Sequence, residues 1–121
     1  MRKRILVVED HEDNRQILRD LLASAGYEMI EAENGEAGVA AATAQVPDLI
    51  LMDIQLPLLD GYEATRRIKA NPALKAIPII VVTSYALSGD EDKARAAGCD
   101  AYIAKPYSPR QLLARIREFL D

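Results

Sequence analysis

The sequence predicts an α/β protein in which a parallel β-sheet carries helices on both faces. Short runs rich in β-branched residues alternate five times with segments of helical periodicity. Several of the runs are continuously apolar, as is typical of strands that are buried on both faces. Polar residues follow these runs directly, where the carboxyl edge of such a sheet would lie. The 121 residues suit one domain, which we take as 1–121.

The expected elements follow in order along the chain. Strands are predicted at 4–8, 28–32, 48–53, 78–82 and 101–103, and helices at 14–25, 35–44, 61–70, 89–97 and 109–120. In the first helix an apolar stripe is expected from Ile17, Leu18, Leu21, Leu22 and Ala25. Gly26 is a plausible stop for that helix, and Asn34-Gly35 marks the entry to the second. Pro47 blocks helix continuation before the third strand.

The helices of the second half have their own boundary signals. Asp60 with Glu63, and Ser88 with Glu91, have the spacing of a capping box. Ser108 followed by Pro109 is typical of an N-cap and first helical residue. The last helix has an apolar face made of Leu112, Leu113, Ile116, Phe119 and Leu120.

The fourth helix differs from the others in its composition. Between Ser88 and Gly98 its apolar residues are the alanines 94, 96 and 97, so it should bury little surface. It is either an ordinary solvated helix or an element that moves during function.

Composition and charge exclude several classes of protein. Half of the residues are hydrophobic, 28% are charged and the net charge is −4, which argues against nucleic acid as a direct partner. The lone Cys99 excludes an internal disulfide and is expected to be a small buried residue beginning a strand. No signal peptide and no run of membrane-spanning length is present, so we expect a cytoplasmic chain without membrane insertion.

Acidic residues follow two of the buried strands. Asp53 ends the run Leu49-Ile50-Leu51-Met52, and Glu9-Asp10 follows the first strand. If these strands are neighbours, three carboxylates meet at one edge of the sheet, where they would favour a divalent cation. Oxygen ligands of this kind describe a Mg²⁺ site. Asp10 could instead cap the first helix.

Other polar residues at this edge have two interpretations each. Lys105 is either solvated or a mobile charge for a phosphoryl oxygen, and Pro106 either ends the strand or forms a cis peptide that aims the lysine. Thr83 is a strand-end hydroxyl or a donor to a phosphoryl oxygen. His11, the only histidine, is expected in a solvated loop rather than as a ligand or base.

Together these motifs closely resemble the receiver domain of two-component response regulators, of the CheY-like and DivK-like kinds. The resemblance runs from Lys3 to Phe119. It rests on Ile5-Leu6-Val7-Val8-Glu9-Asp10, Leu51-Met52-Asp53 with Pro57 and Asp60-Gly61, Val82-Thr83-Ser84, and Tyr102-Ile103-Ala104-Lys105-Pro106. It implies a flavodoxin-like, doubly wound sheet with strand order 2-1-3-4-5.

The resemblance also implies roles for individual residues. Asp53 corresponds to the phosphoacceptor, and Glu9, Asp10, Asp53 and the backbone carbonyl of Gln55 correspond to the Mg²⁺ ligands. Lys105 corresponds to the family's lysine. Thr83 corresponds to the switch hydroxyl and Tyr102 to the switch aromatic, although Tyr102 could simply be a half-buried strand residue.

The expected function is a phosphorylated intermediate in two-component signalling or a phosphorelay. Asp53 would take a phosphoryl group from a phosphohistidine of a histidine kinase or histidine phosphotransfer protein. The domain would assist both steps of its own cycle without being an enzyme for a separate substrate. A surface of the fourth helix, fifth strand and fifth helix would then bind a downstream target. The bulk of Gln55 and Tyr85, two residues beyond Asp53 and Thr83, should slow loss of the phosphate.

The sequence is also compatible with other classes of protein. A haloacid dehalogenase-type phosphotransferase would need a second aspartate two residues after the nucleophile, where Gln55 stands. A phosphate-independent interaction module would not need all the pocket residues. The domain could be a single-domain regulator, which we expect to be a monomer or weak dimer. It could also be a receiver excised from a larger regulator or hybrid kinase, as the start of the first helix, Asp13-Asn14-Arg15, also suggests.

Overall fold

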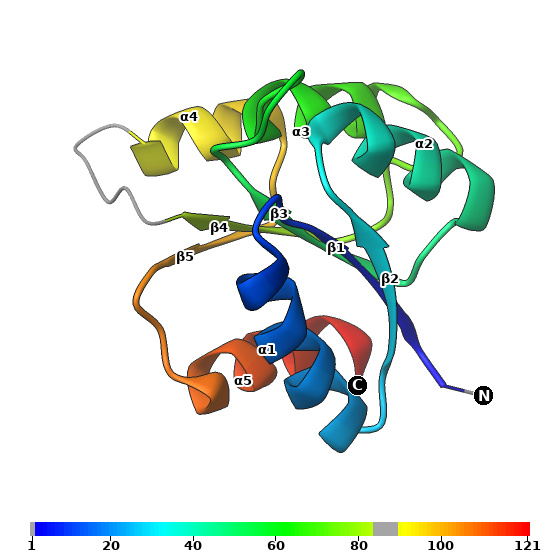
Figure 1. The fold of residues 1–121 in the computed structure, drawn as a ribbon. Coiled ribbons are helices and arrows are strands. Elements are labelled where there is room, and N and C mark those ends of the chain that lie inside the picture. Colours follow the sequence, from blue (N-terminus) through cyan, green and yellow to red (C-terminus); the bar gives the residue numbers. More distant parts are fainter. Residues whose placement is uncertain (1, 84–89) are drawn as a thin grey trace.

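Five parallel strands form a central sheet between two layers of helices (Figure 1). The computed structural model describes residues 2–83 and 90–121. Its elements are β1 (Arg4–Val8), α1 (Glu12–Ser24), β2 (Glu28–Ala32), α2 (Gly35–Gln45), β3 (Leu49–Asp53), α3 (Gly61–Ala70), β4 (Ile79–Thr83), α4 (Asp90–Ala97), β5 (Ala101–Ala104) and α5 (Pro109–Leu120). Each predicted element is therefore confirmed, and the predicted boundaries that fall within the described residues differ from the observed ones by two residues or fewer.

The strand order β2-β1-β3-β4-β5 confirms the flavodoxin-like, doubly wound topology. The register pairs Val8 with Met52 and Asp53 with Val82. The carboxyl ends of β1, β3 and β4 consequently lie at one edge of the sheet. That edge carries the polar residues that the sequence places after each strand.

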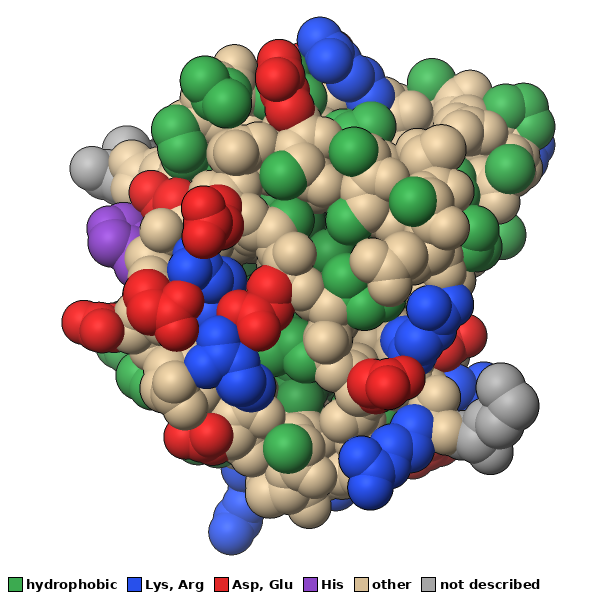
Figure 2. All heavy atoms as spheres, turned by 45° about the vertical axis from the view of Figure 1, so that its right-hand side comes forward, with side chains coloured by type: hydrophobic (Ala, Val, Ile, Leu, Met, Phe, Trp, Pro, Cys, Tyr) green, Lys and Arg blue, Asp and Glu red, His purple; other side chains and the backbone are tan. Residues whose placement is uncertain are grey.

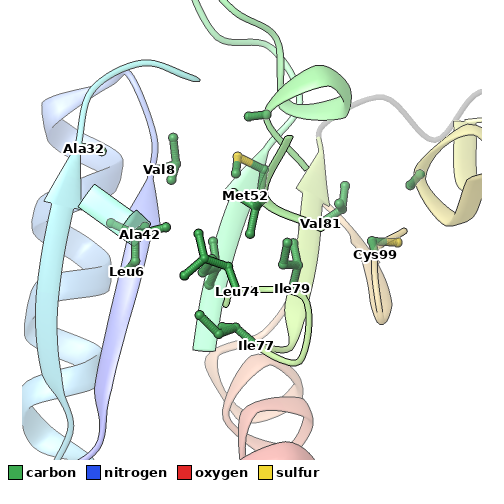
Figure 3. Packing of buried hydrophobic residues seen from close by; sticks show 14 residues of the cluster. Leu6, Val8, Ala32, Ala42, Met52, Leu74, Ile77, Ile79, Val81 and Cys99 are labelled. Carbon is green, nitrogen blue, oxygen red and sulfur yellow. The ribbon is translucent and has the colours of Figure 1, made fainter. Parts of the chain in front are cut away.

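Alternate residues of the central strands face opposite layers of helices, because side chains of a strand alternate between its two faces. Helices α2, α3 and α4 cover one face of the sheet, and α1 and α5 cover the other (Figure 1). The first layer packs on Leu6, Val8, Ile50, Met52, Ile79 and Val81. Figure 3 shows this cluster, including Cys99. Cys99 is buried as expected, but β5 begins two residues later, at Ala101, so Cys99 does not begin the strand. The second layer packs on Ile5, Val7, Leu49, Leu51, Ile80 and Val82.

Most of the predicted helix boundaries are confirmed by their hydrogen bonds. The side chain of Asn34 accepts a bond from Ala37 N–H and that of Asp60 from Glu63 N–H. Ser108 and Gln111 form a complete capping box at the start of α5. Gly26 has a φ of +88°, as a glycine that ends a helix often does.

One residue of the predicted core of α1 lies elsewhere. Leu18 and Leu22 are buried, but Ile17 is 63% exposed. Adjacent helical residues point about 100° apart, so a helix that buries Leu18 turns Ile17 toward its flank. The expectation of a stripe that includes Ile17 was therefore wrong.

Helix α4 buries little, as its composition predicts. Ala94 and Ala97 are buried, whereas Ala96 is exposed. The predicted cap at Ser88, the helix start at 89 and the expectation for Tyr85 lie outside the described residues. Within the described part of the chain, no helix has the length and apolar character needed to cross a membrane.

A glycine allows α3 to begin directly against the end of β3. A Cβ atom on Gly61 would lie 2.0 Å from the carbonyl oxygen of Asp53. The Gly61 N–H donates to the carbonyl of Ile54 at 2.9 Å. This close backbone approach fixes the loop that follows Asp53.

Candidate phosphoacceptor and metal site

The structure brings together the acidic residues that follow β1 and β3. Glu9 is 3% exposed and Asp53 is 9% exposed, whereas Asp10 is partly exposed. The ammonium of Lys105, in the loop after β5, lies 3.1 Å from Glu9 Oε1 and 3.4 Å from Asp53 Oδ2. Three elements that are far apart in sequence therefore place their charged ends in one cluster.

Glu9 is held by several donors as well as by Lys105. Its carboxylate accepts bonds from the His11 backbone N–H at 3.0 Å and from Asn14 Nδ2 at 3.2 Å. Burial alone would raise the pKa of Glu9, but the hydrogen bond from His11 and the charge of Lys105 lower it to about 2. Glu9 is therefore ionised at neutral pH.

The pKa of Asp53 is shifted in the opposite direction from that of Glu9. Burial raises the pKa of its carboxyl group to about 6; the Lys105 ammonium opposes this rise, and the Glu9 carboxylate reinforces it. The Gln55 N–H donates to Asp53 Oδ1 at 3.3 Å. The ionised Asp53 carboxylate is thus poorly compensated by the protein and would gain from a cation.

Lys105 is positioned by its own backbone. Its N–H donates to the carbonyl of Thr83 at 2.6 Å, and the Lys105-Pro106 peptide is cis, as the sequence analysis allowed. Burial alone would lower the pKa of Lys105, but Asp53 and Glu9 raise it. The lysine therefore stays charged beside the two carboxylates, and the solvated interpretation is wrong.

Asp10 does not cap the first helix. His11 occupies the N-cap position of α1, and no side chain makes a capping bond there. Asp10 Oδ1 is instead buried and accepts no hydrogen bond among the described residues, although His11 Nδ1 lies 3.1 Å away. A buried carboxylate oxygen without a donor is a suitable ligand for a cation.

The His11 ring is close to the acidic pair but belongs to the surface. Ligand atoms of Glu9, Asp10 and His11 lie within 4.8 Å of one another. The His11 side chain is nevertheless 71% exposed, as the loop expectation required. Oxygen atoms of the carboxylates suit a hard cation such as Mg²⁺ better than an imidazole nitrogen does.

Thr83 and Tyr102 lie on the face of the sheet that packs against α4. Thr83, which is 1% exposed, follows Val81 by two residues and so faces the same layer. Tyr102 pairs with Val81 in the register and packs, partly buried, against the same cluster. The two residues assigned to the switch thus share one face of adjacent strands.

Three residues near the site have contacts that no sequence motif indicates. Asn14 bonds Glu9, Arg15 donates to the Glu9 carbonyl, and Tyr107 lines a neighbouring cavity. The cavity, about 370 Å³, lies between α1 and the β5–α5 loop and reaches Asp53. Burial raises the pKa of Tyr107. A polar residue in the first turn of α1, close after the acidic pair, is the one sequence signal that could have indicated Asn14 and Arg15.

A five-stranded α/β fold with a buried carboxylate cluster and one lysine at its carboxyl edge defines a class of phosphoryl-accepting proteins. The chain matches the family model described as response regulator receiver domain over residues 5–117. It belongs to that family, and its function is that of a phosphoacceptor receiver in two-component signalling.

Relatives and solved structures agree with this assignment. The chain is 44% identical to the polar-differentiation response regulator DivK of Brucella anthropi, over 99% of the chain and 98% of that protein. The receiver domain of the sensor histidine kinase PA1611 from Pseudomonas aeruginosa is 38% identical, with a TM-score of 0.92 and coverage of 99% and 98%. That structure has a magnesium ion coordinated in its active-site cleft. Chemotaxis protein CheY4 of Vibrio cholerae is 26% identical, also with a TM-score of 0.92 and coverage of 98% and 99%.

Proposed function

We propose that Asp53 is the phosphoacceptor of this receiver. The observation that carries the proposal is a buried carboxylate at the end of β3 with the Lys105 ammonium 3.4 Å away. The donor is a phosphohistidine on a histidine kinase or on a histidine phosphotransfer protein. The unit that acts is a single receiver domain spanning residues 1–121.

In the proposed reaction an oxygen of the Asp53 carboxylate attacks the phosphorus in line. The new O–P bond forms as the N–P bond breaks, and the electron pair of that bond leaves with the histidine imidazole. With a pKa of about 6, Asp53 is mostly ionised at neutral pH and can act as the nucleophile. Lys105 places its charge beside the transferring oxygens, where it offsets their negative charge. Water later attacks the phosphorus of the acyl phosphate; the bond between phosphorus and the Asp53 oxygen breaks, inorganic phosphate leaves and the carboxylate is regenerated.

The oxygen ligands at this site fit Mg²⁺. The ion would be held by Glu9, Asp10, Asp53 and the backbone carbonyl of Gln55. Two observations support this assignment: Asp10 Oδ1 is buried and accepts no hydrogen bond among the described residues, and the Glu9 and Asp53 carboxylates share the single Lys105 ammonium. Bound Mg²⁺ would supply a divalent charge that stabilises the phosphoryl oxygens. The assignment of the Gln55 backbone carbonyl as a Mg²⁺ ligand stays a prediction.

The output is a proposed switch between Thr83 and Tyr102. A phosphoryl group on Asp53 attracts the Thr83 hydroxyl, and Tyr102 turns inward on the face that the two residues share. The surface of α4, β5 and α5 changes for a downstream target, and α4, which buries two alanines, offers little resistance. Phosphorylated Tyr102→Ala should bind its target more weakly than the phosphorylated parent, and equal affinity would remove Tyr102 from the switch.

We also propose how the domain acts and where it is found. The domain assists its own phosphorylation and dephosphorylation and does not act on a separate substrate. It is a cytoplasmic monomer or weak dimer without direct contact to nucleic acid. Whether it acts alone or within a larger regulator or hybrid kinase does not change the chemistry of the site.

The test is intact mass spectrometry after incubation with Mg²⁺ and acetyl phosphate. We expect one added phosphoryl group on the parent, none without Mg²⁺ and none on Asp53→Asn. Asp13→Asn, a change at an exposed carboxylate of α1, is the matched control and should be modified like the parent. If the parent stays unmodified by both acetyl phosphate and a phosphorylated histidine kinase, the chain is a phosphate-independent interaction module.

A further inference from the structure

Arg15 is a buried arginine directly behind the proposed metal ligands. It lies in the first turns of α1 and is 6% exposed. Its Nη1 donates to the backbone carbonyl of Glu9 at 2.8 Å. A buried guanidinium is costly unless its donors are used, so the partners of this side chain indicate its role.

Three carboxylates hold the rest of the guanidinium. Its Nη2 bonds Glu12 one turn earlier in α1, and its Nε lies 3.3 Å from Glu31 of β2. Glu33, just after β2, lies 3.4 Å away. Figure 2 shows this region as a patch of interleaved acidic and basic side chains beside the histidine. Arg15 therefore connects α1 and β2 to the loop that carries the acidic pair.

The contact to Glu9 is made with the peptide group and not with the carboxylate. The Glu9 N–H donates to Ala32 O at 3.0 Å, and the Glu9 carboxylate is held by Asn14 and Lys105. Arg15 holds the remaining polar group of this residue, the carbonyl of the peptide that leads to Asp10. The orientation of that peptide sets the direction in which Asp10 leaves the strand.

We propose that Arg15 is a positioning residue for the divalent cation: by clamping the Glu9 carbonyl to the carboxylates of Glu12 and Glu31, it keeps the Glu9–Asp10 peptide in the orientation that binds metal. The inference rests on the proposed Mg²⁺ site. It assigns part of the metal affinity to a residue that touches neither the cation nor the phosphoryl group. Groups that orient metal ligands in this way typically contribute 10–100-fold to metal affinity.

If Arg15 acted only through its charge, its removal would change the Mg²⁺ affinity in the opposite direction. Arg15 carries a positive charge near the site, so its removal alone would strengthen the binding of a cation. A positioning role predicts that the same removal weakens binding. The direction of the change in Mg²⁺ affinity therefore distinguishes a positioning role from an electrostatic role.

Arg19, one turn further along α1, is a matched control. It pairs with two of the three carboxylates that hold Arg15: Glu31 Oε1 lies at 2.6 Å and Glu12 Oε1 at 3.3 Å. Its hydrogen bonds go to Glu12, Gln16 and Glu31, and the Glu9 carbonyl is bonded by Arg15. Arg19→Met thus removes the same charge from the same cluster and leaves the clamp in place.

The experiment is an NMR titration of the metal-free protein with Mg²⁺, following the backbone amides of residues 9–15 in the parent, Arg15→Met, Arg15→Lys and Arg19→Met. We expect Arg15→Met to bind Mg²⁺ about tenfold more weakly than the parent. Arg15→Lys, which keeps the charge but loses the fork of donors, should fall between the two. Arg19→Met should stay within about twofold of the parent.

Each other outcome overturns the inference. If Arg15→Met binds Mg²⁺ as tightly as the parent or more tightly, Arg15 has a structural or electrostatic role only. The same conclusion holds if Arg19→Met loses as much Mg²⁺ affinity as Arg15→Met does. If Arg15→Met does not fold, parent-like binding by Arg15→Lys overturns it. A parent that binds no Mg²⁺ overturns the proposed metal site as well, which distinguishes that failure from a failure of the clamp alone.

Discussion

Asp53 and Glu9 show how neighbouring carboxyl groups of one cluster reach opposite states. Both are buried, but Glu9 accepts bonds from His11 N–H, Asn14 and Lys105, whereas Asp53 has the longer contacts to Lys105 and Gln55. The pKa of Glu9 is accordingly low and that of Asp53 is raised to about 6. The protein thus stabilises one carboxylate fully and leaves the other in need of a cation.

The raised pKa of Asp53 predicts a specific dependence of stability on pH. Between its usual value of 3.8 and about 6, the folded metal-free protein binds more protons at Asp53 than the unfolded chain does. Asp53 therefore lowers stability as the pH rises through this window, by about 2 kcal/mol. Asp53→Asn removes the effect, so the variant should gain that much over the parent between about pH 4 and about pH 7.5.

Urea unfolding in EDTA at the two pH values measures this difference. A stability difference between Asp53→Asn and the parent that is the same at both pH values would show that the pKa of Asp53 is not raised in the folded state.

At the scale of elements, the caps and turns carry most of the local sequence signals. Asn34, Asp60 and Ser108 start their helices with side-chain bonds to backbone N–H groups. The end of α2 is the exception. Val46 forms the C-cap with a φ of +43°, in the left-handed region that disfavours β-branched residues, and it is 50% exposed. This position stores strain that a better residue would relieve.

Val46→Asn should therefore stabilise the protein by about 0.5–1 kcal/mol, because asparagine tolerates the left-handed conformation and the lost side chain is half exposed. The measurement is the urea midpoint of the variant and the parent. Val46→Ala removes the branched side chain but keeps a Cβ atom, so it should gain less. A destabilised Val46→Asn would show that packing of the valine outweighs the backbone strain.

At the scale of the molecule, the amino and carboxyl edges of the sheet have different roles. At the amino edge Lys69 donates to the carbonyls of Lys75 and Ile77 and to Asp100, at 3.0, 2.8 and 2.8 Å. This fully satisfied ammonium closes that edge. At the carboxyl edge the carboxylates repel one another. The core and the amino edge supply the stability, and the carboxyl edge carries the function.

A cation at the carboxyl edge should therefore stabilise the whole domain. At about 100 times the Kd, Mg²⁺ should add about 2.7 kcal/mol to the unfolding free energy, because the ion binds the folded state alone. The shift in Tm with Mg²⁺ measures this in a domain that unfolds as one unit. Asp10→Asn should lose most of the shift and Asp13→Asn should keep it. An equal shift in both variants would place the ion elsewhere.

The sequence by itself determined the alternation of strands and helices, the caps and the residues of the acidic edge. Each depends on local periodicity or on residue types next to a strand, which a linear pattern records. The burial of Arg15, the exposure of Ile17 and the distances between Lys105, Glu9 and Asp53 were decided by the tertiary structure. An arginine is buried only when partners such as Glu31, on another element, satisfy it, and a local pattern does not contain that pairing.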